Sequence, residues 1–278
     1  MRVLIAGCGY VGSALGTMLA AGGNEVFGLR RDPSALPQGI GPVALDLTQE
    51  IPSDRLPPNL DYVFYTASAD SSDEAAYRSA YVDGPRNLLE VLKDRGDELR
   101  RFFFTSSTGV YGQSDGEWVD ETSPTEPRMT GRILLEGERE VTASPYPTTI
   151  VRLAGIYGPG RTRSIVRGLE IPEADGAPVY TNRIHVDDCA GVLRDLTHLS
   201  EPEGLYLAVD SEPTDRRTVA EWIAVRLEQQ PVKQYASNTR RLRTSKRFSN
   251  ARLRATGYEF RYPTFREGCA ALLDETNG

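Results

Sequence analysis

The predicted fold depends on residues 2–12, which read Arg2-Val3-Leu4-Ile5-Ala6-Gly7-Cys8-Gly9-Tyr10-Val11-Gly12. A short apolar run, typical of a buried strand, leads directly into the pattern G-x-G-x-x-G. The residues that follow, up to Ala21, have helical periodicity, which Gly22-Gly23 ends. A glycine pattern that follows a strand and opens a helix predicts a dinucleotide-binding turn. A glycine-rich turn without a ligand is the alternative.

Each glycine of this pattern has a separate expected role. Gly7 allows a tight turn, Gly9 leaves space for a pyrophosphate beside the backbone, and Gly12 allows the helix to pack closely on the strand. The helix that begins near Tyr10 and Val11 presents unpaired backbone N–H groups and a partial positive charge. We therefore expect these five residues to bind the phosphates of a dinucleotide.

The end of the second predicted strand distinguishes NADP from NAD. NAD sites commonly have an acidic residue here, which accepts hydrogen bonds from the ribose 2′-hydroxyl. This chain has Leu29-Arg30-Arg31-Asp32, and arginines suit a 2′-phosphate through charge-assisted hydrogen bonds. The sequence therefore favours NADP as the cofactor. NAD is the alternative if Asp32 serves as the ribose acid, or if both arginines are only solvated.

Strand and helix patterns alternate along the rest of the chain. Apolar runs at 26–29, 43–45, 62–65, 101–105 and 148–153 predict strands, and 75–92 predicts a long helix. This alternation is typical of a parallel sheet covered by helices on both faces. The predicted fold class is α/β, a Rossmann-type doubly wound parallel sheet with a small C-terminal substrate lobe. We expect the sheet domain at 1–160 and 184–210, and the lobe at 161–183 and 211–278.

Composition and charge argue against several other classes of protein. The 278 residues carry a net charge of −7, which disfavours binding to nucleic acid. The three cysteines lie far apart and there are two histidines, so neither a disulfide framework nor a metal site is expected. No apolar stretch approaches the roughly 20 residues of a membrane helix, and a strand at Arg2 leaves no room for a signal peptide. We expect a cytoplasmic protein.

Further strings along the chain point to one family. They are Asp46-Leu47, Thr66-Ala67-Ser68, Tyr81-Val82-Asp83-Gly84-Pro85-Arg86-Asn87-Leu88-Leu89, Thr105-Ser106-Ser107-Thr108-Gly109-Val110-Tyr111-Gly112, Arg152-Leu153-Ala154-Gly155-Ile156-Tyr157-Gly158-Pro159-Gly160 and Arg183-Ile184-His185-Val186-Asp187-Asp188. With these strings in this order, the chain resembles the extended short-chain dehydrogenase/reductase family, the NAD(P)-dependent sugar epimerases and dehydratases.

The resemblance implies roles for several residues. Asp46 and Leu47 would contact the adenine, and the loop of Thr66, Ala67 and Ser68 would run along the cofactor. Ser107 would hydrogen-bond the reacting carbonyl or hydroxyl group. The family also uses a Tyr-x-x-x-Lys pair, in which the lysine lowers the pKa of the tyrosine and holds the nicotinamide ribose. A phenol, whose ordinary pKa is near 10, needs such a cation to transfer protons near neutral pH.

The matching segment departs from that pair. It reads Pro127-Arg128-Met129-Thr130-Gly131-Arg132-Ile133-Leu134, which places Thr130 at the tyrosine position and Leu134 at the lysine position. Tyr81 stands where the family has an asparagine. We therefore expect an atypical member, whose candidate catalytic residues are Ser107, Tyr81 and Thr130.

Substrate-binding candidates lie near residues 160–183. The resemblance implies that Asn182 and Arg183 lie where the substrate lobe meets the cofactor domain. Arg183 would clamp an anionic substrate unless it forms only a surface ion pair, and Arg161, after the glycine loop, is a further candidate for this role. We expect His185 to serve in packing and Asp188 to cap the following helix. The interval from Gly160 to Thr181 is short for a nucleotide-sugar enzyme of this family, so a nucleotide-sugar substrate is disfavoured.

Three functions stay open at this point. The favoured one is an NADP-dependent oxidoreductase that acts on an unidentified small molecule. A non-catalytic or regulatory dinucleotide-binding protein is the alternative, and a sugar-nucleotide epimerase or dehydratase ranks third because of Thr130 and Leu134. The family often pairs through two helices, here 75–92 and about 128–141, so a homodimer is expected. Tyr77, Leu88, Leu89, Ile133 and Leu134 would supply its apolar contacts, unless they face the core of their own chain.

Overall fold

The structure is a computed structural model that describes residues 1–125, 127–161, 170–171, 177–227, 232–233 and 245–276. Parts of the predicted substrate lobe therefore lie outside the described residues. In the part of the chain that is described, no helix has the length and apolar character needed to cross a membrane.

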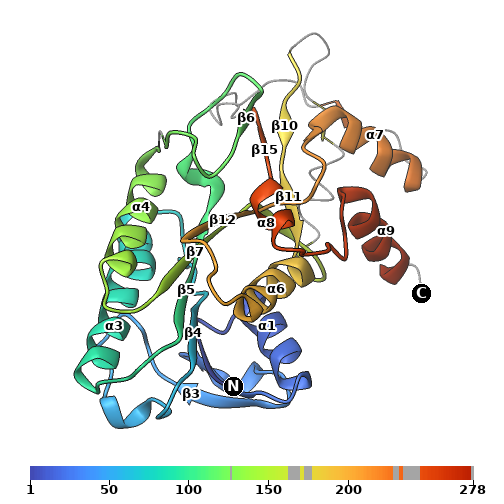
Figure 1. Ribbon diagram of the computed structural model, residues 1–278. Coiled ribbons are helices and arrows are strands. Elements are labelled where there is room, and N and C mark those ends of the chain that lie inside the picture. The colour runs from blue at the N-terminus through green and yellow to red at the C-terminus, as the bar shows by residue number, and fades with distance from the viewer. Residues whose placement is uncertain (126, 162–169, 172–176, 228–231, 234–244, 277–278) are drawn as a thin grey trace. The chain divides into compact units, whose positions relative to one another are not determined.

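Helices and strands alternate through the first two thirds of the chain (Figure 1). The α-helices are α1 (Tyr10–Ala21), α2 (Glu74–Arg78), α3 (Gly84–Asp94), α4 (Met129–Thr142), α6 (Val186–Asp195), α7 (Arg216–Arg226), α8 (Ala251–Ala255) and α9 (Phe265–Thr276). The shorter helical turns are η1 (Pro33–Ala35), η2 (Ser53–Arg55), the π-helical η3 (Ser79–Asp83), η4 (Thr108–Val110) and η6 (Leu196–His198). The strands are β1 (Arg2–Ala6), β2 (Glu25–Arg30), β3 (Ile40–Ala44), β4 (Tyr62–Tyr65), β5 (Arg101–Ser107), β6 (Glu117–Val119), β7 (Thr148–Leu153), β8 (Gly155–Tyr157), β9 (Glu170–Ile171), β10 (Tyr180–Thr181), β11 (Arg183–His185), β12 (Leu205–Ala208), β13 (Thr214–Asp215), β14 (Val232–Lys233) and β15 (Lys246–Phe248).

The central sheet has the strand order β12-β7-β5-β4-β1-β2-β3 and is parallel. Strand β1 is flanked by β2 and β4, so that Ala6 lies opposite both Leu29 and Tyr65. The chain runs outward from β1 in one direction and then returns to continue from β4 in the other. The strand order therefore reverses between β1 and β4, which is where doubly wound sheets bind their ligands. This arrangement confirms the predicted Rossmann-type fold class.

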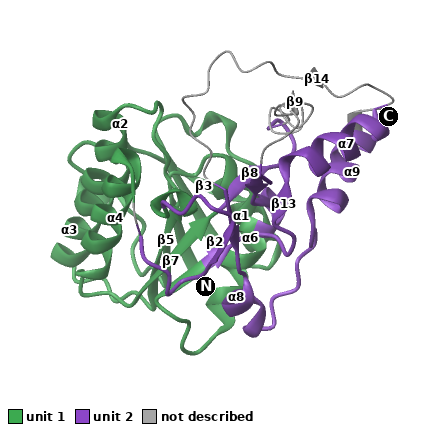
Figure 2. Cartoon of the chain, turned by 90° about the horizontal axis from the view of Figure 1, so that it is seen from above, with its two compact units in different colours: residues 1–111, 127–153, 189–206 green, residues 112–126, 154–188, 207–278 purple. Residues whose placement is uncertain are grey.

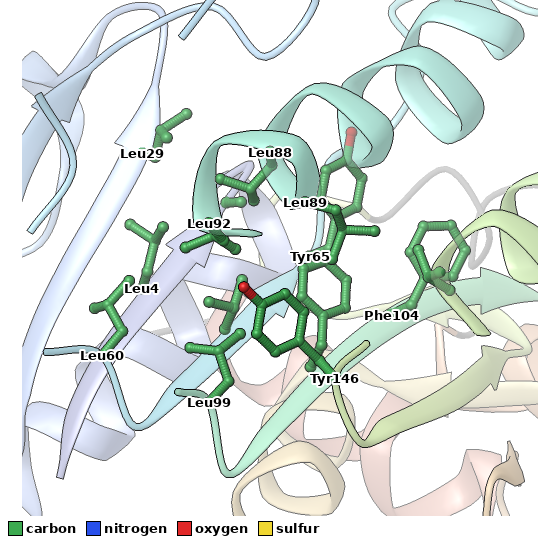
Figure 3. Close-up of a cluster of buried hydrophobic side chains, with 14 of the residues drawn as sticks. Leu4, Leu29, Leu60, Tyr65, Leu88, Leu89, Leu92, Leu99, Phe104 and Tyr146 are labelled. Atoms are coloured by element: carbon green, nitrogen blue, oxygen red, sulfur yellow. The ribbon is translucent and has the colours of Figure 1, made fainter. Parts of the chain in front are cut away.

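Helices cover both faces of this sheet. Helices α3 and α4 lie on one face, and α1 and α6 lie on the other (Figure 1). Such coverage buries strands on both sides, and every side chain of β4 is buried. On the α3 side, Tyr65 and Phe104 pack with Leu88 and Leu92 in one apolar cluster (Figure 3). On the opposite side of the strands, the rings of Phe64 and Phe103 stack at 4.8 Å.

The predicted long helix at 75–92 is interrupted by the π-helical turn η3. A π-helical turn holds one extra residue and shifts the backbone hydrogen bonds. Here the carbonyl of Ala80 accepts a hydrogen bond from the hydroxyl of Tyr65 at 2.6 Å. A Cβ atom on Gly84 would overlap that hydroxyl, which explains the glycine. Tyr65 lies on β4, so the sheet itself stabilises the turn.

Most of the residues predicted to form an apolar dimer interface are buried within their own chain. Leu88, Leu89, Ile133 and Leu134 are all buried, and only Tyr77 of the five predicted residues is partly exposed. The prediction that these four leucine and isoleucine side chains bind a second copy is therefore wrong, because their own helices pack them against the core. The homodimer itself stays a prediction.

The chain divides into two compact units (Figure 2). Unit 1 comprises 1–111, 127–153 and 189–206, and unit 2 comprises 112–126, 154–188 and 207–278. Unit 1 holds most of the central sheet. Unit 2 has its own core, in which Tyr157, Ile223, Phe265 and Cys269 are buried together. Unit 2 also includes 112–126, 154–160, 184–188 and 207–210, which the predicted limits assigned to the sheet domain.

Candidate functional site

The glycine turn closes tightly at the carboxyl end of β1. Gly7 has a φ of 82°, a value that favours glycine, and a Cβ atom there would overlap Ala67. The backbone N–H groups of Gly7 and Cys8 both donate to the carbonyl of Leu29 at 2.9 Å. The Gly9 N–H donates to the Gly7 carbonyl at 2.6 Å. Both the tight turn and the closeness of the neighbouring loop therefore require glycine at position 7.

Gly12 and Gly9 face different surroundings. A Cβ atom on Gly12 would lie 2.7 Å from Thr66 Oγ1 and 2.9 Å from Ile5 Cγ2, so that glycine lets α1 pack against β1. A Cβ atom on Gly9 would have the Gly7 carbonyl oxygen, at 3.8 Å, as its single neighbour within 4 Å among the described residues. Gly9 caps α1 without a side chain. A side-chain position at Gly9 therefore points into open space at the start of α1.

The predicted cofactor loop after β4 contacts this turn directly. Thr66 donates from its backbone N–H to the Ala6 carbonyl at 2.8 Å, and from its hydroxyl to the Gly7 carbonyl at 2.9 Å. Ala67 lies against Gly7, while Ser68 is exposed. The structure therefore brings together two segments that are about 60 residues apart in the sequence.

Asp46 and Leu47 follow β3 and are held by local hydrogen bonds. Asp46 Oδ1 accepts from the backbone N–H of Thr48 at 3.0 Å and from its hydroxyl at 2.8 Å. Leu47 is buried, and its carbonyl accepts from Asn87 Nδ2 at 3.0 Å. Adenine contact by this pair stays a prediction.

The three polar residues at the end of β2 have distinct partners. Arg30 Nη1 donates to the Cys8 carbonyl at 3.4 Å, which ties it to the glycine turn. Arg31 forms an exposed ion pair with Asp70, in the loop after β4. Asp32 caps η1 by accepting from the Ser34 N–H at 2.9 Å, and this hydrogen bond lowers the pKa of its carboxyl group. Asp32 is thus engaged locally, which weakens the alternative that it serves as a ribose acid.

Ser107 caps the short turn η4, and the first turn of α4, which holds Thr130, lies next to that turn. Ser107 Oγ accepts from the Gly109 N–H at 3.1 Å and so caps η4. A Cβ atom on Gly131, next to Thr130, would lie 2.9 Å from the Gly109 carbonyl oxygen. The first turn of α4 therefore packs against η4. Leu134, one turn later, is buried, so the predicted lysine position presents an apolar side chain to the core.

Tyr81 lies in the π-helical turn η3, and its ring is 5.3 Å from that of Tyr77. Burial, and to a smaller extent the nearby Tyr77, raises the pKa of its phenol to about 12, while the backbone of Ala69 has the opposite effect. A Cβ atom on Gly137 would overlap the Tyr81 carbonyl, which places α4 directly against the turn. The surroundings thus shift this phenol away from the low pKa that an acid/base tyrosine needs.

A buried ion pair that the sequence analysis missed involves Tyr111. Arg152 on β7 donates to Glu138 on α4 through Nε at 2.9 Å and Nη2 at 2.6 Å, and to the Tyr111 hydroxyl through Nη1 at 2.6 Å. All three side chains are buried. Tyr111 therefore has a structural role here. An Arg within a predicted buried strand was the sequence signal, because a buried charge requires a partner.

The substrate-binding candidates lie in unit 2 and differ in their surroundings. Arg183 is half-buried, with its guanidinium 5.9 Å from the centre of the Phe265 ring. Burial lowers its pKa, and the nearby Asp210 opposes that effect. Asn182 donates to the Lys246 carbonyl and accepts from the Phe248 N–H, both at 2.9 Å, so its amide holds β15. Arg161 is exposed, and its backbone N–H donates to Gly158.

Asp188 does not cap a helix. It lies inside α6, fully buried, and its carboxylate accepts hydrogen bonds from the Tyr258 hydroxyl at 2.9 Å, the Arg261 N–H at 2.7 Å and the Tyr262 N–H at 3.0 Å. The cap prediction is wrong because the helix begins two residues earlier. His185 is packed as expected: its ring lies 4.1 Å from that of Tyr262, and its Nδ1 accepts from the Asp187 N–H.

Comparisons with known proteins agree with this geometry. The sequence model of the NAD dependent epimerase/dehydratase family matches residues 3–173, more than half of the chain. Protein YeeZ of Escherichia coli (strain K12) is 30% identical over 216 residues, which cover 74% of this chain and 76% of YeeZ. The structure of a candidate NAD-dependent epimerase/dehydratase from Methylobacillus flagellatus is 35% identical, with a TM-score of 0.82, and the match covers 100% of this chain and 99% of that one.

More distant structures share the fold. MoeE5, solved in complex with UDP-glucose and NAD, is 24% identical with a TM-score of 0.81 over 100% of this chain and 99% of its own. Human epimerase family protein SDR39U1, solved with NADPH, is 17% identical with a TM-score of 0.77 over 96% of this chain and 97% of its own. The glycine turn, the strand order and the family match together lead to one assignment: the chain belongs to the NAD-dependent epimerase/dehydratase family, of the extended short-chain dehydrogenase/reductase type.

Proposed function

We propose that unit 1 binds a nicotinamide dinucleotide, with NADP(H) preferred over NAD(H), and that the protein is an oxidoreductase for a small molecule. The observation that carries the proposal is the open space beside Gly9, at the uncapped start of α1. The dinucleotide pyrophosphate would be held there by backbone N–H groups. Thr66 and Ala67 would line the same place, since they contact the turn.

Arg31 supports the preference for NADP. Its side chain is 63% exposed and extends just beyond the end of β2, where a 2′-phosphate would lie. Asp32, which would compete as a ribose acid, is occupied in capping η1. Relatives with this fold bind NAD in one case and NADPH in another, so the residues of this chain must decide.

The cofactor, when bound, supplies the hydride. The chain supplies alignment and hydrogen bonds. Ser107 Oγ accepts one hydrogen bond from Gly109, and a hydroxyl still has its own proton to donate. Ser107 would therefore hold the reacting carbonyl or imine. Tyr81 is the weaker candidate for proton transfer, because burial raises its pKa to about 12.

A non-catalytic dinucleotide-binding protein is the second candidate function. The observation that favours it is the buried Leu134 at the predicted lysine position, together with the raised pKa of Tyr81. In this case the cofactor would bind equally well, but no hydride transfer would follow.

Isothermal titration calorimetry with NADPH and NADH tests the cofactor assignment. We expect NADPH to bind roughly 10- to 100-fold more tightly, since a hydrogen bond to a charged group contributes about 1.5–3 kcal/mol. Arg31→Ala should remove most of this difference. Equal affinities for the two cofactors in the wild type, or an unchanged NADPH affinity in Arg31→Ala, would contradict the assignment.

A further inference from the structure

The exposed ion pair between Arg31 and Asp70 bridges the two loops that flank the glycine turn. Arg31 follows β2, and Asp70 lies five residues beyond the end of β4. These strands lie on either side of β1. Arg31 Nη2 is 2.9 Å from both carboxylate oxygens of Asp70. All of these residues belong to unit 1.

Asp70 is held in place by its own loop. The loop is anchored at its start by the hydroxyl of Thr66, which donates to the Gly7 carbonyl at 2.9 Å. The backbone is therefore constrained on the side of Asp70 that leads back to β4. A carboxylate on an anchored backbone loses less conformational freedom on pairing than one on a free loop.

We propose that Asp70 is a cofactor-specificity residue, which holds Arg31 by occupying the donors that a 2′-phosphate would otherwise take. This inference rests on the proposed NADP binding. A 2′-phosphate is an anion with three acceptor oxygens and competes with the carboxylate for the guanidinium. A ribose 2′-hydroxyl carries no charge and does not compete. Binding of NADPH therefore requires release of Arg31 from Asp70, whereas binding of NADH does not.

A change of charge at residue 70 should therefore alter the affinity for NADPH and leave the affinity for NADH unchanged. Asp70→Asn removes the competing charge and is expected to tighten NADPH binding about two- to fivefold, the range expected for an exposed ion pair. NADH binding should stay the same. The gain should shrink in high salt, because screening weakens the competing pair.

A double-mutant cycle distinguishes direct competition from a general electrostatic effect. Calorimetry with NADPH and NADH is performed on wild type, Asp70→Asn, Arg31→Ala and the double variant. Asp94→Asn is the control, because it removes the same charge from the exposed last residue of α3, which precedes the amino end of β5, whereas Asp70 follows the carboxyl end of β4. Thermal unfolding verifies that each variant is folded.

The expected result is a gain in NADPH affinity for Asp70→Asn in the wild-type background and no gain in the Arg31→Ala background or for Asp94→Asn. No gain in either background, or an equal gain in both, would overturn the inference while leaving the NADP assignment intact. If the wild type does not prefer NADPH, the proposed cofactor preference fails first, and the inference fails with it.

Discussion

At the scale of single residues, the space around each glycine of the turn predicts what a larger side chain would do there. Gly9 and Gly12 are three residues apart, yet a methyl group would meet open space at one and packed atoms at the other. We expect Gly9→Val to abolish dinucleotide binding while the protein still folds, because the branched side chain occupies the space of the pyrophosphate. Calorimetry and circular dichroism measure the two effects. Unchanged binding would mean that the turn is only structural.

Gly12→Ala is expected to act on stability. The new methyl group would lie 2.7 Å from Thr66 Oγ1 and 2.9 Å from Ile5 Cγ2. Overpacking of this kind costs about 1–3 kcal/mol in the free energy of unfolding. Chemical denaturation of Gly12→Ala beside wild type measures this loss. A variant of wild-type stability would show that α1 can move away from β1 at little cost.

Rates of NADPH oxidation by two variants distinguish the catalytic contribution of the Ser107 hydroxyl from that of the Tyr81 phenol. We expect Ser107→Ala to lower NADPH oxidation roughly 10²-fold or more, as loss of a preorganised donor does, and Tyr81→Phe to have less than about a tenfold effect. Since the pKa of Tyr81 is raised to about 12, its phenol stays protonated below that pH, and turnover between pH 7 and 10 should show no ionisation from it. The assay uses a broad carbonyl and imine panel. A larger effect of Tyr81→Phe would identify it as the proton donor.

At the scale of elements, buried polar side chains join segments that are far apart. Asp188 on α6 accepts three hydrogen bonds from residues 258–262. We expect Asp188→Ala to reduce the free energy of unfolding by about 3 kcal/mol, because it leaves buried donors unpaired. Asp187→Ala is the control: its ion pair with Arg261 is partly exposed and contributes about 1 kcal/mol or less. Similar losses for the two variants in urea denaturation would contradict this account.

The π-helical turn shows why element boundaries were harder to predict than element types. The pattern over 75–92 is helical throughout, and both flanking segments are α-helices. Within the interruption at 79–83, the Ala80 carbonyl accepts a hydrogen bond from the hydroxyl of Tyr65, which belongs to β4. A helical pattern contains only neighbours three and four residues apart. It therefore cannot reveal a hydrogen bond that arrives from the sheet.

At the scale of the whole molecule, we expect no turnover of nucleotide sugars. Thr130 and Leu134 stand at the predicted positions of the tyrosine and lysine, and loss of a general acid/base typically lowers a rate about 10²- to 10⁴-fold. UDP- and dTDP-sugars incubated with protein and cofactor, and analysed by chromatography, provide the test. Robust conversion of either by the wild type would refute this expectation and favour an epimerase or dehydratase.

The oligomeric state also belongs to this scale. The outer surfaces of α2, α3 and α4 carry ion pairs between helices of the same chain, Arg78 with Glu136 and Arg86 with Glu140. A dimer through these helices would therefore have a polar interface, in contrast to the apolar one that the sequence suggested. Light scattering at about 0.1 M and 1 M salt tests this form, since screening weakens charged contacts. A monomer at both salt concentrations would remove the dimer from consideration.

The sequence by itself determined the α/β class, the start of the dinucleotide-binding unit and the family, because these depend on patterns among residues that are close together along the chain. A strand, three glycines and a helix lie within residues 2–21, and neighbours along the chain form them. Only the tertiary structure decided which polar groups meet. Arg31 and Asp70 are 39 residues apart, Tyr111 and Arg152 are 41 apart, and Asp188 and Tyr258 are 70 apart. Such pairs depend on how strands are ordered in the sheet and how loops fold back over its edge, and no local pattern of residues contains that information.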